Sequence, residues 1–551
     1  MIDPRKSAAV AALREVAGNR SLRRVELSWT LGTAAEQAFL VVALVAAYQA
    51  AGVVGVTLVG LARTIPALAV ALLVDVERGA GPAVMLGIAN GVRALGAAGL
   101  AALAVAGLPQ LAIVGAVAAS AAAGVLARPA VNALRPALAT SPSELVAANV
   151  AASTGEGAGT FAGPLLAGIG LATVGPGPTL VAIAVAFAIA MLAGMVPVSA
   201  AARPTARPHG VPILAGLRVL AARPSVAAVM AGLGAQIFVR GLLIVLMVVV
   251  AVDLLGLGDG AVGGLTAAMG AGGLIGATLS LGLAARQRLA PAYAVALTMW
   301  SLPLAAIGLV PETAIAVGAL VVVGMANAAL DIAAFTLFQR TLRGGQRGAV
   351  FGTLEVVVAI GLAAGSVLAP PLVDAVGITG ALVVAGAILP LTALATWPLI
   401  RRIDDEATIP AADVAVLRAV PMLRLLPLAG LERLASDTRR RTYDPGDVVV
   451  REGDPGDTFH VIVHGTASVE RQGRVVRELS GGDGFGEIAL LRTSVRTATV
   501  RAREPLETLE IGREAFLGAV TGHEGAARSA HGTVDERLAR DRTGGEVPAG
   551  E

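Results

Sequence analysis

Long apolar stretches alternate with short polar connections through the first 400 residues of the chain. Twelve of these stretches are long enough to cross a bilayer, because a hydrocarbon core needs about 20 helical residues. The predicted spans are residues 27–50, 53–74, 83–106, 109–133, 145–172, 177–199, 224–252, 260–284, 290–310, 313–337, 349–374 and 379–400. The pattern predicts an α-helical membrane protein.

The connections between the predicted spans differ in charge on the two sides of the membrane. Arg residues are frequent in the N-terminal segment and near residues 75–82, 128–135, 203–223, 286–288, 340–347 and 401–402. The other connections have no Lys or Arg and lie near residues 51–52, 108–110, 175–178, 253–259, 311–312 and 377. By the positive-inside rule, both termini of this multi-pass protein lie in the cytoplasm.

The composition limits the chemistry that the chain can perform. Hydrophobic residues make up 56% of the 551 residues, which is too apolar for a soluble protein of this length. The chain has no Cys and five scattered His residues, so we expect no disulfide, metal site or cofactor. No nucleophile–base set or Walker loop is present, so we expect neither an enzyme nor an ATP-driven pump. The wealth of Ala, Gly, Val and Arg, beside the single Lys6, is typical of a GC-rich bacterial genome and favours a bacterial cytoplasmic (inner) membrane.

The pattern changes after residue 402. Residues 403–412 form a charged linker, and residues 413–441 place apolar side chains at helical spacing. Short strand-like runs then alternate with glycine turns, at 448–450, 459–463, 467–471, 475–479, 497–501 and 506–511. This pattern predicts a small β-barrel or jelly roll within a cytoplasmic α+β domain, followed by helices at 514–519 and 526–540. The predicted parts are a cytoplasmic segment 1–24, a helical membrane part 25–402, the linker, the α+β domain 413–540 and a disordered tail 541–551.

The helical part contains an internal echo. Residues 158–166 match residues 364–372, and Val54-Gly55 matches Val262-Gly263, both at an offset near 207 residues. A duplicated six-helix unit would give such an offset, with the long basic connection between the two halves.

Two six-helix halves with both ends in the cytoplasm resemble the major facilitator superfamily over roughly residues 20–400. Residues 128–149 are similar to the fourth-to-fifth helix region of its drug and siderophore exporter-like members. The resemblance implies secondary transport by alternating access between the halves, with an exporter-like direction.

Ionisable residues inside the predicted spans are candidates for function, because each costs about 2.5–3.5 kcal/mol on insertion scales. They are Glu36, Arg63, Arg93, Glu156, Arg240, Asp331 and Glu355. Glu36, Glu156 and Asp331 are candidate proton carriers, and Arg93 is a candidate for holding an acidic substrate. The alternative for each is a structural role in an ion pair between helices.

A glycine-rich segment near the C-terminus carries a carboxylate and a guanidinium nine residues apart. Four glycines between residues 481 and 486 lead into the short apolar turn 487–491, which begins with Glu487, and Arg496 follows. Glycines before a helical turn expose backbone N–H groups that suit a phosphate, and arginine donates forked hydrogen bonds to one. Because a carboxylate accepts hydrogen bonds from sugar hydroxyls, the segment predicts a nucleotide site.

With its surroundings, this segment resembles the cyclic nucleotide-binding domain of catabolite activator proteins, cyclic-nucleotide-gated channels and cyclic-nucleotide-dependent kinases. The resemblance covers residues 444–511 and includes Pro445-Gly446, Gly453-Asp454, Gly456-Asp457, Gly465, Phe485-Gly486-Glu487-Ile488-Ala489-Leu490 and Arg496-Thr497-Ala498. It implies that Glu487 binds the ribose 2′-hydroxyl and that Arg496 pairs with the cyclic phosphate. It also implies that N–H groups near Gly486, Glu487, Ile488 and Ala489 cradle that phosphate. Thr497 would contact the phosphate or a guanine base, so both cAMP and cGMP stay open as ligands.

Together these patterns predict a secondary active, proton-coupled exporter that is regulated by cytoplasmic cAMP or cGMP. Its expected partners are the lipid bilayer, the cyclic nucleotide and an unidentified small-molecule substrate. Two alternatives stay open: a membrane-anchored cyclic nucleotide sensor that does not transport, and a lipid or lysolipid transporter on the same fold. Too few residues follow the β-roll for a DNA-binding helix-turn-helix, so no nucleic-acid partner is expected.

Overall fold

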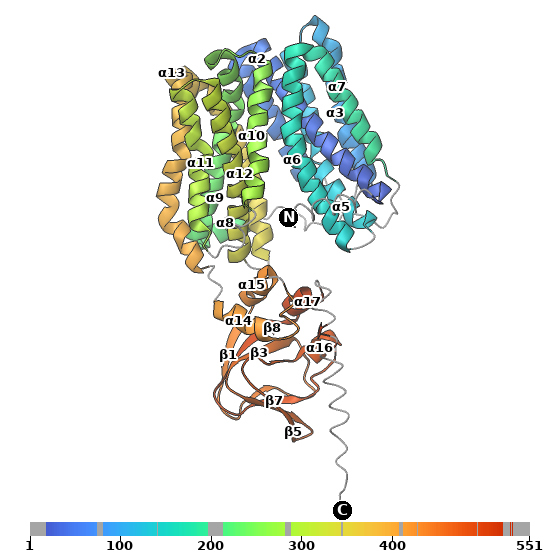
Figure 1. Cartoon of the computed structure of the whole chain (residues 1–551), viewed down its shortest axis with the longest axis vertical. Helices are drawn as coiled ribbons and strands as arrows, with labels where there is room; N and C mark the ends of the chain where they lie inside the picture. The colour runs from blue at the N-terminus through green and yellow to red at the C-terminus, as the bar shows by residue number, and fades with distance from the viewer. Residues whose placement is uncertain are drawn as a thin grey trace, which may run out of the picture. The chain divides into compact units, whose positions relative to one another are not determined.

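The chain divides into two compact units, Met1–Asp404 and Asp405–Glu551. The computed structural model describes residues 18–73, 81–139, 142–196, 213–280, 288–342, 345–406, 411–426, 428–492, 494–521, 529–530 and 532. Figure 1 shows the first unit as a bundle of long helices and the second as strands with short helices. Each unit has buried apolar clusters of its own.

The described part of the first unit is helical. Its elements are α2 (Arg20–Leu73), α3 (Pro82–Leu103), η2 (Ala104–Ala106), α4 (Gln110–Gly124), α5 (Ala127–Leu138), α6 (Pro142–Thr173), α7 (Pro176–Gly194), α8 (Ile213–Ala222), α9 (Pro224–Val249), η3 (Val250–Leu254), α10 (Gly260–Leu279), α11 (Ala290–Leu309), α12 (Thr313–Thr341) and α13 (Gly345–Glu406). Helix α2 is broken at Gly52 and α13 at Gly377, whose φ angles of 57° and 72° favour glycine. These breaks divide each of the two helices into two arms.

Each of the twelve predicted spans falls on a helix, as far as the chain is described. The arms of α2 carry the first two spans, the arms of α13 carry the last two, and the fourth span is split between α4 and α5. Among the described helices, nine stretches are long and apolar enough to cross a membrane: α2, α3, α4 with α5, α7, α9 with η3, α10, α11, α12 and α13. Helix α6 matches the fifth span but is not among them, because its many glycines and Glu156 lower its hydropathy. Passage of these helices through a membrane stays a prediction.

The sequence echo corresponds to equivalent helix crossings in the two halves. Helix α6 crosses α2 at Gly159, where a Cβ would lie 3.0 Å from the backbone N of Ala34. Helix α13 crosses α9 at Gly365, where a Cβ would lie 2.8 Å from the backbone N of Leu242. Gly365 follows Gly159 by 206 residues, and Leu242 follows Ala34 by 208. The same kind of close crossing therefore recurs at the offset that the sequence suggests.

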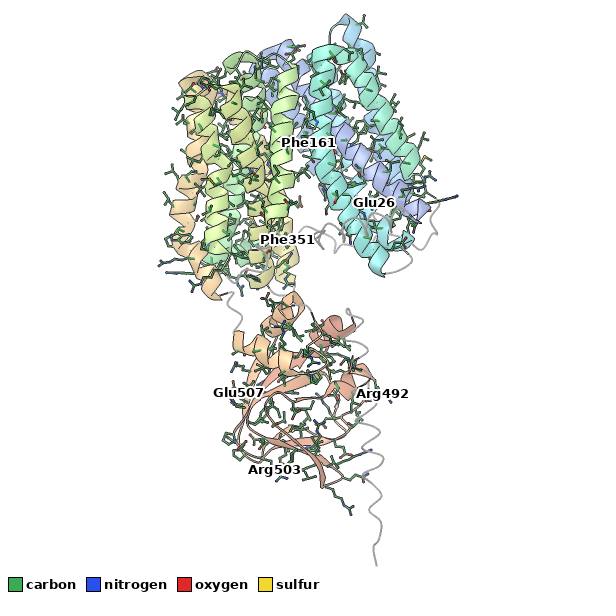
Figure 2. The ribbon with its side chains drawn as sticks, viewed as in Figure 1. Glu26, Phe161, Phe351, Arg492, Arg503 and Glu507 are labelled. Atoms are coloured by element: carbon green, nitrogen blue, oxygen red, sulfur yellow. The ribbon has the colours of Figure 1, made fainter. Side chains whose placement is uncertain are left out.

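Small residues also bring the two halves together. Phe161, labelled on α6 in Figure 2, lies against α10, where a Cβ on Gly270 would lie 3.0 Å from its Cα. On the second arm of α2, the hydroxyl of Thr57 donates a hydrogen bond of 3.2 Å to the carbonyl of Ser366 on α13. Close packing of this kind is typical of helices in membranes.

The second unit is a β-roll with helices at its ends. Its elements are α14 (Ala411–Ala419), α15 (Leu428–Ser436), β1 (Arg439–Tyr443), β2 (Val448–Val450), β3 (Thr458–His464), β4 (Ala467–Arg471), β5 (Arg474–Leu479), β6 (Gly484–Phe485), α16 (Glu487–Leu491), β7 (Thr499–Ala502), β8 (Leu506–Gly512) and α17 (Arg513–Thr521). Two antiparallel sheets have the strand orders β1-β8-β3-β6 and β2-β7-β4-β5. The rings of Phe459 on β3 and Phe516 on α17 pack with centroids 4.6 Å apart.

The helix predicted for residues 413–441 is confirmed over α14 and α15, and it is wrong at the turns 420–426 and at strand β1. The structure has α14, a series of turns, α15 and then strand β1, which pairs with β8. The helices predicted at 487–491 and 514–519 are confirmed as α16 and α17. Most of the helix predicted at 526–540 and the tail at 541–551 lie outside the described residues.

Candidate functional site

The pairing of β3 with β6 sets the geometry of the glycine-rich segment. In the antiparallel register, His460 lies opposite Phe485 and Val461 lies opposite Gly484. Gly486 follows β6 and precedes α16 with a φ of 96°, a left-handed value that favours glycine. A Cβ on Gly486 would lie 2.5 Å from Nη1 of Arg496, so only glycine leaves room for this guanidinium.

Arg496 is buried, and a turn fixes its backbone. Its N–H donates to the carbonyl of Asp454 at 2.8 Å, and the N–H of Gly453 donates to the Arg496 carbonyl at 2.9 Å. The guanidinium donates to the carbonyl and the hydroxyl of Thr458, both at 2.8 Å, and to the carbonyl of Gly486 at 3.3 Å. These three acceptors are neutral, and Arg496 has no ion pair among the described residues. The guanidinium is thus held in position without a carboxylate in direct contact.

Carboxylates act on Arg496 from a longer range. Burial lowers the pKa of the Arg496 guanidinium, and the negative charges of Asp457, Glu487 and Asp454 oppose this shift. Glu487, the first residue of α16, is only 1% exposed. The structure therefore brings the two predicted ligand-binding side chains, one acidic and one basic, into the same buried region.

His460 and Arg496 both contact the hydroxyl of Thr458. The Nε2 atom of His460 is 3.0 Å from the hydroxyl of Thr458, which also accepts a hydrogen bond from Arg496. The imidazole stacks on Phe485 with ring centroids 5.1 Å apart. Burial, and then the positive charges of Arg496 and Arg441, lower the pKa of His460 to about 3. The imidazole is therefore neutral at physiological pH, and it supports Thr458 without adding a charge.

Comparison with known proteins agrees with this geometry. Residues 440–523 match the family described as the cyclic nucleotide-binding domain. The second unit contains a cyclic nucleotide-binding domain. The chain is similar to the cAMP-dependent protein kinase regulatory subunit of Yarrowia lipolytica, with 38% identity over 112 residues, 19% of this chain and 30% of that protein. It is also similar to the subunit of the same name from Schizosaccharomyces pombe, with 36% identity over 103 residues, 18% of this chain and 25% of that protein.

A solved structure described as cAMP-bound PfPKA-R is similar at 23% identity and a TM-score of 0.25, over 28% of this chain and 53% of that one. The chain spans less than a third of the length of the two curated relatives.

The remaining predicted residues of the cyclic nucleotide-binding domain lie around the same turn. Ile488 and Ala489 belong to α16, and Ala489 is buried against Gly456, where a Cβ would clash with it. Thr497 is half-buried in the bend before β7. The roles of these residues in binding a ligand stay predictions.

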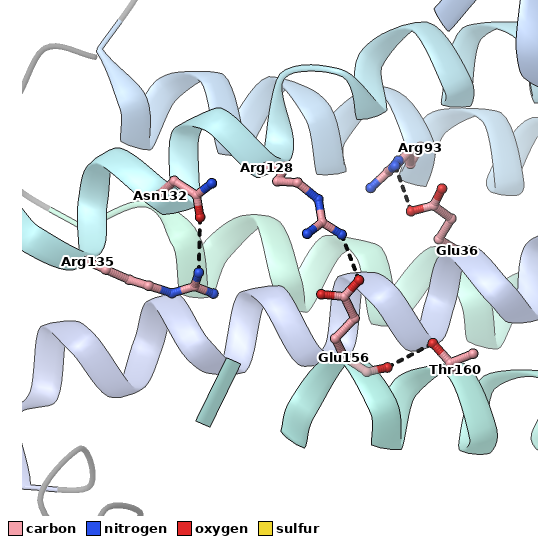
Figure 3. A network of polar contacts seen from close by, with 7 residues as sticks. All are labelled: Glu36, Arg93, Arg128, Asn132, Arg135, Glu156 and Thr160. Atoms are coloured by element: carbon pink, nitrogen blue, oxygen red, sulfur yellow. Dashed lines mark hydrogen bonds and ion pairs between the residues drawn. The ribbon is translucent and has the colours of Figure 1, made fainter. Parts of the chain in front are cut away.

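In the first half of the helical unit, three of the candidate residues lie in ion pairs. Figure 3 shows Arg93 beside Glu36 and Arg128 beside Glu156. Nη2 of Arg93 lies 2.8 Å from Oε2 of Glu36, and this guanidinium also lies over the ring of Phe187. Nη2 of Arg128 lies 2.6 Å from Oε1 of Glu156 in an exposed pair. These are the ion pairs that the structural alternative predicted, and roles in transport stay predictions.

Asp331 lies in the second half, in a polar cluster centred on Asn327, a residue that was not among the predicted candidates. The amide of Asn327 donates to Asp331 at 3.1 Å, and its oxygen accepts from Trp300 at 3.0 Å and from Arg240. Asn327 precedes Asp331 by one helical turn, so their proximity could have been predicted from the sequence.

In the nucleotide-binding domain, Thr458 was missed as well, although Thr458 and His460 share one face of a strand by their spacing of two.

Proposed function

We propose that the chain is a membrane transporter controlled by a cyclic nucleotide bound at Glu487 and Arg496. Arg496 carries the nucleotide part of this proposal, because its buried guanidinium is positioned by Thr458 and Gly486 and donates to neutral acceptors. A cyclic phosphate would supply an anionic acceptor, and hydrogen bonds to charged groups contribute about 1.5–3 kcal/mol each. The curated relatives are cAMP-dependent protein kinase regulatory subunits, which supports cAMP as the first ligand to test, with cGMP beside it.

The helical unit supports the transport part of the proposal. Its two halves share equivalent helix crossings, and ionisable side chains lie within the bundle, as in transporters that alternate access between repeats. The arginine-rich connections support placing the nucleotide-binding domain in the cytoplasm, at a bacterial cytoplasmic membrane. The proposed activity is proton-coupled export without a catalytic step.

The binding test is a calorimetric titration of the full-length protein in detergent with cAMP and with cGMP. We expect binding of at least one nucleotide, and we expect Arg496→Ala to weaken it by roughly 10–100-fold. Arg474→Ala is the matched control, because Arg474 is an exposed arginine on β5 of the same domain. Absence of heat with either nucleotide, or full affinity in Arg496→Ala, would refute the assigned site.

Control of the helical unit by the nucleotide is tested without knowing the substrate. The chain has no Cys, so Ala137→Cys on α5 and Gln339→Cys on α12 place spin labels on exposed positions of the two halves. A coupling of about 1–3 kcal/mol would shift the balance of conformations 5–150-fold. We expect cAMP or cGMP to change the distribution of distances between the labels. An unchanged distribution at saturating nucleotide would refute the coupling and favour the membrane-anchored sensor.

A further inference from the structure

The buried arginines of the first half face carboxylates directly. Arg93 pairs with Glu36 at 2.8 Å, and its side chain is 6% exposed. Arg135 on α5 donates to both oxygens of Glu26 on α2, at 2.7 and 3.3 Å, and both side chains are 8% exposed. Burial of an arginine is costly unless a partner of opposite charge satisfies it, so these pairs stabilise the bundle without leaving a net charge.

Arg240 on α9 is different, because the side-chain amide of Asn327 lies between its guanidinium and the carboxylate of Asp331. Its guanidinium donates to the side-chain oxygen of Asn327, which also accepts from Trp300 at 3.0 Å and lies 3.5 Å from the amide nitrogen of Gln236. The amide nitrogen of Asn327 then donates to Asp331 at 3.1 Å. The Nε atom of Arg240 is buried and has no hydrogen-bond partner within the described chain. Arg240 therefore keeps donor capacity that its surroundings do not use.

A second arginine, from the other half, adds positive charge at Arg240. Arg63 lies on the second arm of α2, is half-buried, and acts on Arg240 through its positive charge. It has no ion pair with any residue that the structure describes. The charges that act on Arg240 are the carboxylate of Asp331 and the guanidinium of Arg63, so this group of three side chains carries one net positive charge. Like charges in a poorly solvated place repel, and an anion would relieve that repulsion.

The duplication shows how the second half differs in charge. Trp300 follows Arg93 by 207 residues, and Asn327 follows Ser120 by 207. Nε of Arg93 donates to the carbonyl of Ser120 at 3.4 Å, and Nε1 of Trp300 donates to the side chain of Asn327 at 3.0 Å. The two contacts occupy equivalent places in the halves. In the first half this place holds a neutralised arginine, and in the second half it holds a neutral tryptophan beside Arg240.

We propose that Arg240 and Asn327, with the added positive charge of Arg63, form a binding site for the oxyanion head of a small organic anion, a carboxylate or a phosphate. The site rests on the proposed transport function and gives the class of its substrate. Arginine presents donors in a fork that matches both kinds of head group, and the free Nε of Arg240 is one arm of such a fork. One bound monoanion would balance the net charge of the two arginines and Asp331.

Trp300 provides the readout, because its indole donates to the same Asn327 oxygen as Arg240. The chain has three Trp residues, so Trp29→Phe with Trp397→Phe leaves Trp300 as the reporter. This full-length variant in detergent is titrated with benzoate, with methyl phosphate and with short-chain phosphatidic acid. Benzamide is the neutral control. We expect a change in emission with an oxyanion and none with benzamide. A response to the soluble anions identifies a solute, and a response to phosphatidic acid alone identifies a lipid head group.

The variants separate a binding role from a structural one. Arg63→Gln and Arg240→Gln should weaken oxyanion binding by roughly tenfold or more, whereas Arg128→Gln, in an exposed ion pair, should not. Without ligand, Arg63→Gln should raise the temperature of thermal unfolding, because it removes a like charge from Arg240. A lower unfolding temperature for Arg63→Gln, no response to any oxyanion, or full affinity in both variants would overturn the proposal. None of these measurements needs flux or a cyclic nucleotide, so they stand even if the transport function fails.

Discussion

Replacing His460 by Phe should remove a pH dependence from the stability of the nucleotide-binding domain. The pKa of His460 is about 3 in the folded domain because the imidazole is buried beside Arg496 and Arg441, whereas the ordinary value is 6.5. Between these values the unfolded chain binds a proton that the folded domain excludes, so stability falls as the pH falls below about 6.5. The slope is about 1.4 kcal/mol per pH unit, which gives a loss of about 2 kcal/mol between pH 7.5 and pH 5.

The assay compares urea unfolding of residues 405–551 for wild type and His460→Phe at several pH values between 7.5 and 5, followed by circular dichroism. Phe keeps a ring to stack on Phe485 but cannot bind a proton. The other histidines of this unit are common to both proteins, so the difference between them isolates His460. We expect the variant to lose about 2 kcal/mol less than wild type by pH 5. Parallel losses in the two proteins would refute a neutral, proton-excluding His460.

Three further substitutions test the ion pairs and the glycine turn. Glu36→Gln leaves the buried guanidinium of Arg93 without its carboxylate and should destabilise the full-length protein by roughly 1–3 kcal/mol in thermal unfolding. Glu156→Gln, in an exposed pair, should cost less than about 1 kcal/mol, and equal costs would contradict the difference in burial. Gly486→Ala places a Cβ 2.5 Å from the guanidinium of Arg496 and should lower nucleotide affinity roughly tenfold or more in calorimetry with the fold intact, so unchanged affinity would refute this packing argument.

The helices of the first unit could be predicted from the sequence, because the length of an apolar run can be measured without knowing any distant contact. The breaks at Gly52 and Gly377 lie at connections that the charge pattern predicts. Strand β1 was not readable. Its arginines are exposed and it is held by backbone pairing with β8 and by ion pairs such as Arg440 with Glu507 and Arg441 with Glu510. Both partners are more than 60 residues away in the sequence, so the local helical pattern before β1 was extended too far.

In the nucleotide site, too, some residues could be predicted from the sequence and others could not. Glu487 and Arg496 could be predicted because they and the glycines before them lie in one short segment of the sequence. Thr458, which holds the guanidinium of Arg496, lies 38 residues away and reaches it through the fold of β3. Hydrogen bonds of this kind depend on strand register, which the residues of one segment do not reveal. The sequence therefore gives the side chains that would meet the ligand more readily than those that position them.

In the duplicated helices, positions that pack closely are constrained more strictly than positions that carry charge. A close crossing depends on the absence of a side chain, so Gly159 is constrained by a backbone that a Cβ would displace. Charged groups act through long side chains, so they can diverge between the halves while the helices stay in place. Arg93 contacts Glu36, whereas the equivalent Trp300 is neutral and Arg240 contacts the amide of Asn327 rather than a carboxylate. If the two halves rock against each other, the charge of a substrate would then be sensed by the second half, with the first half contributing Arg63 when the bundle closes around it.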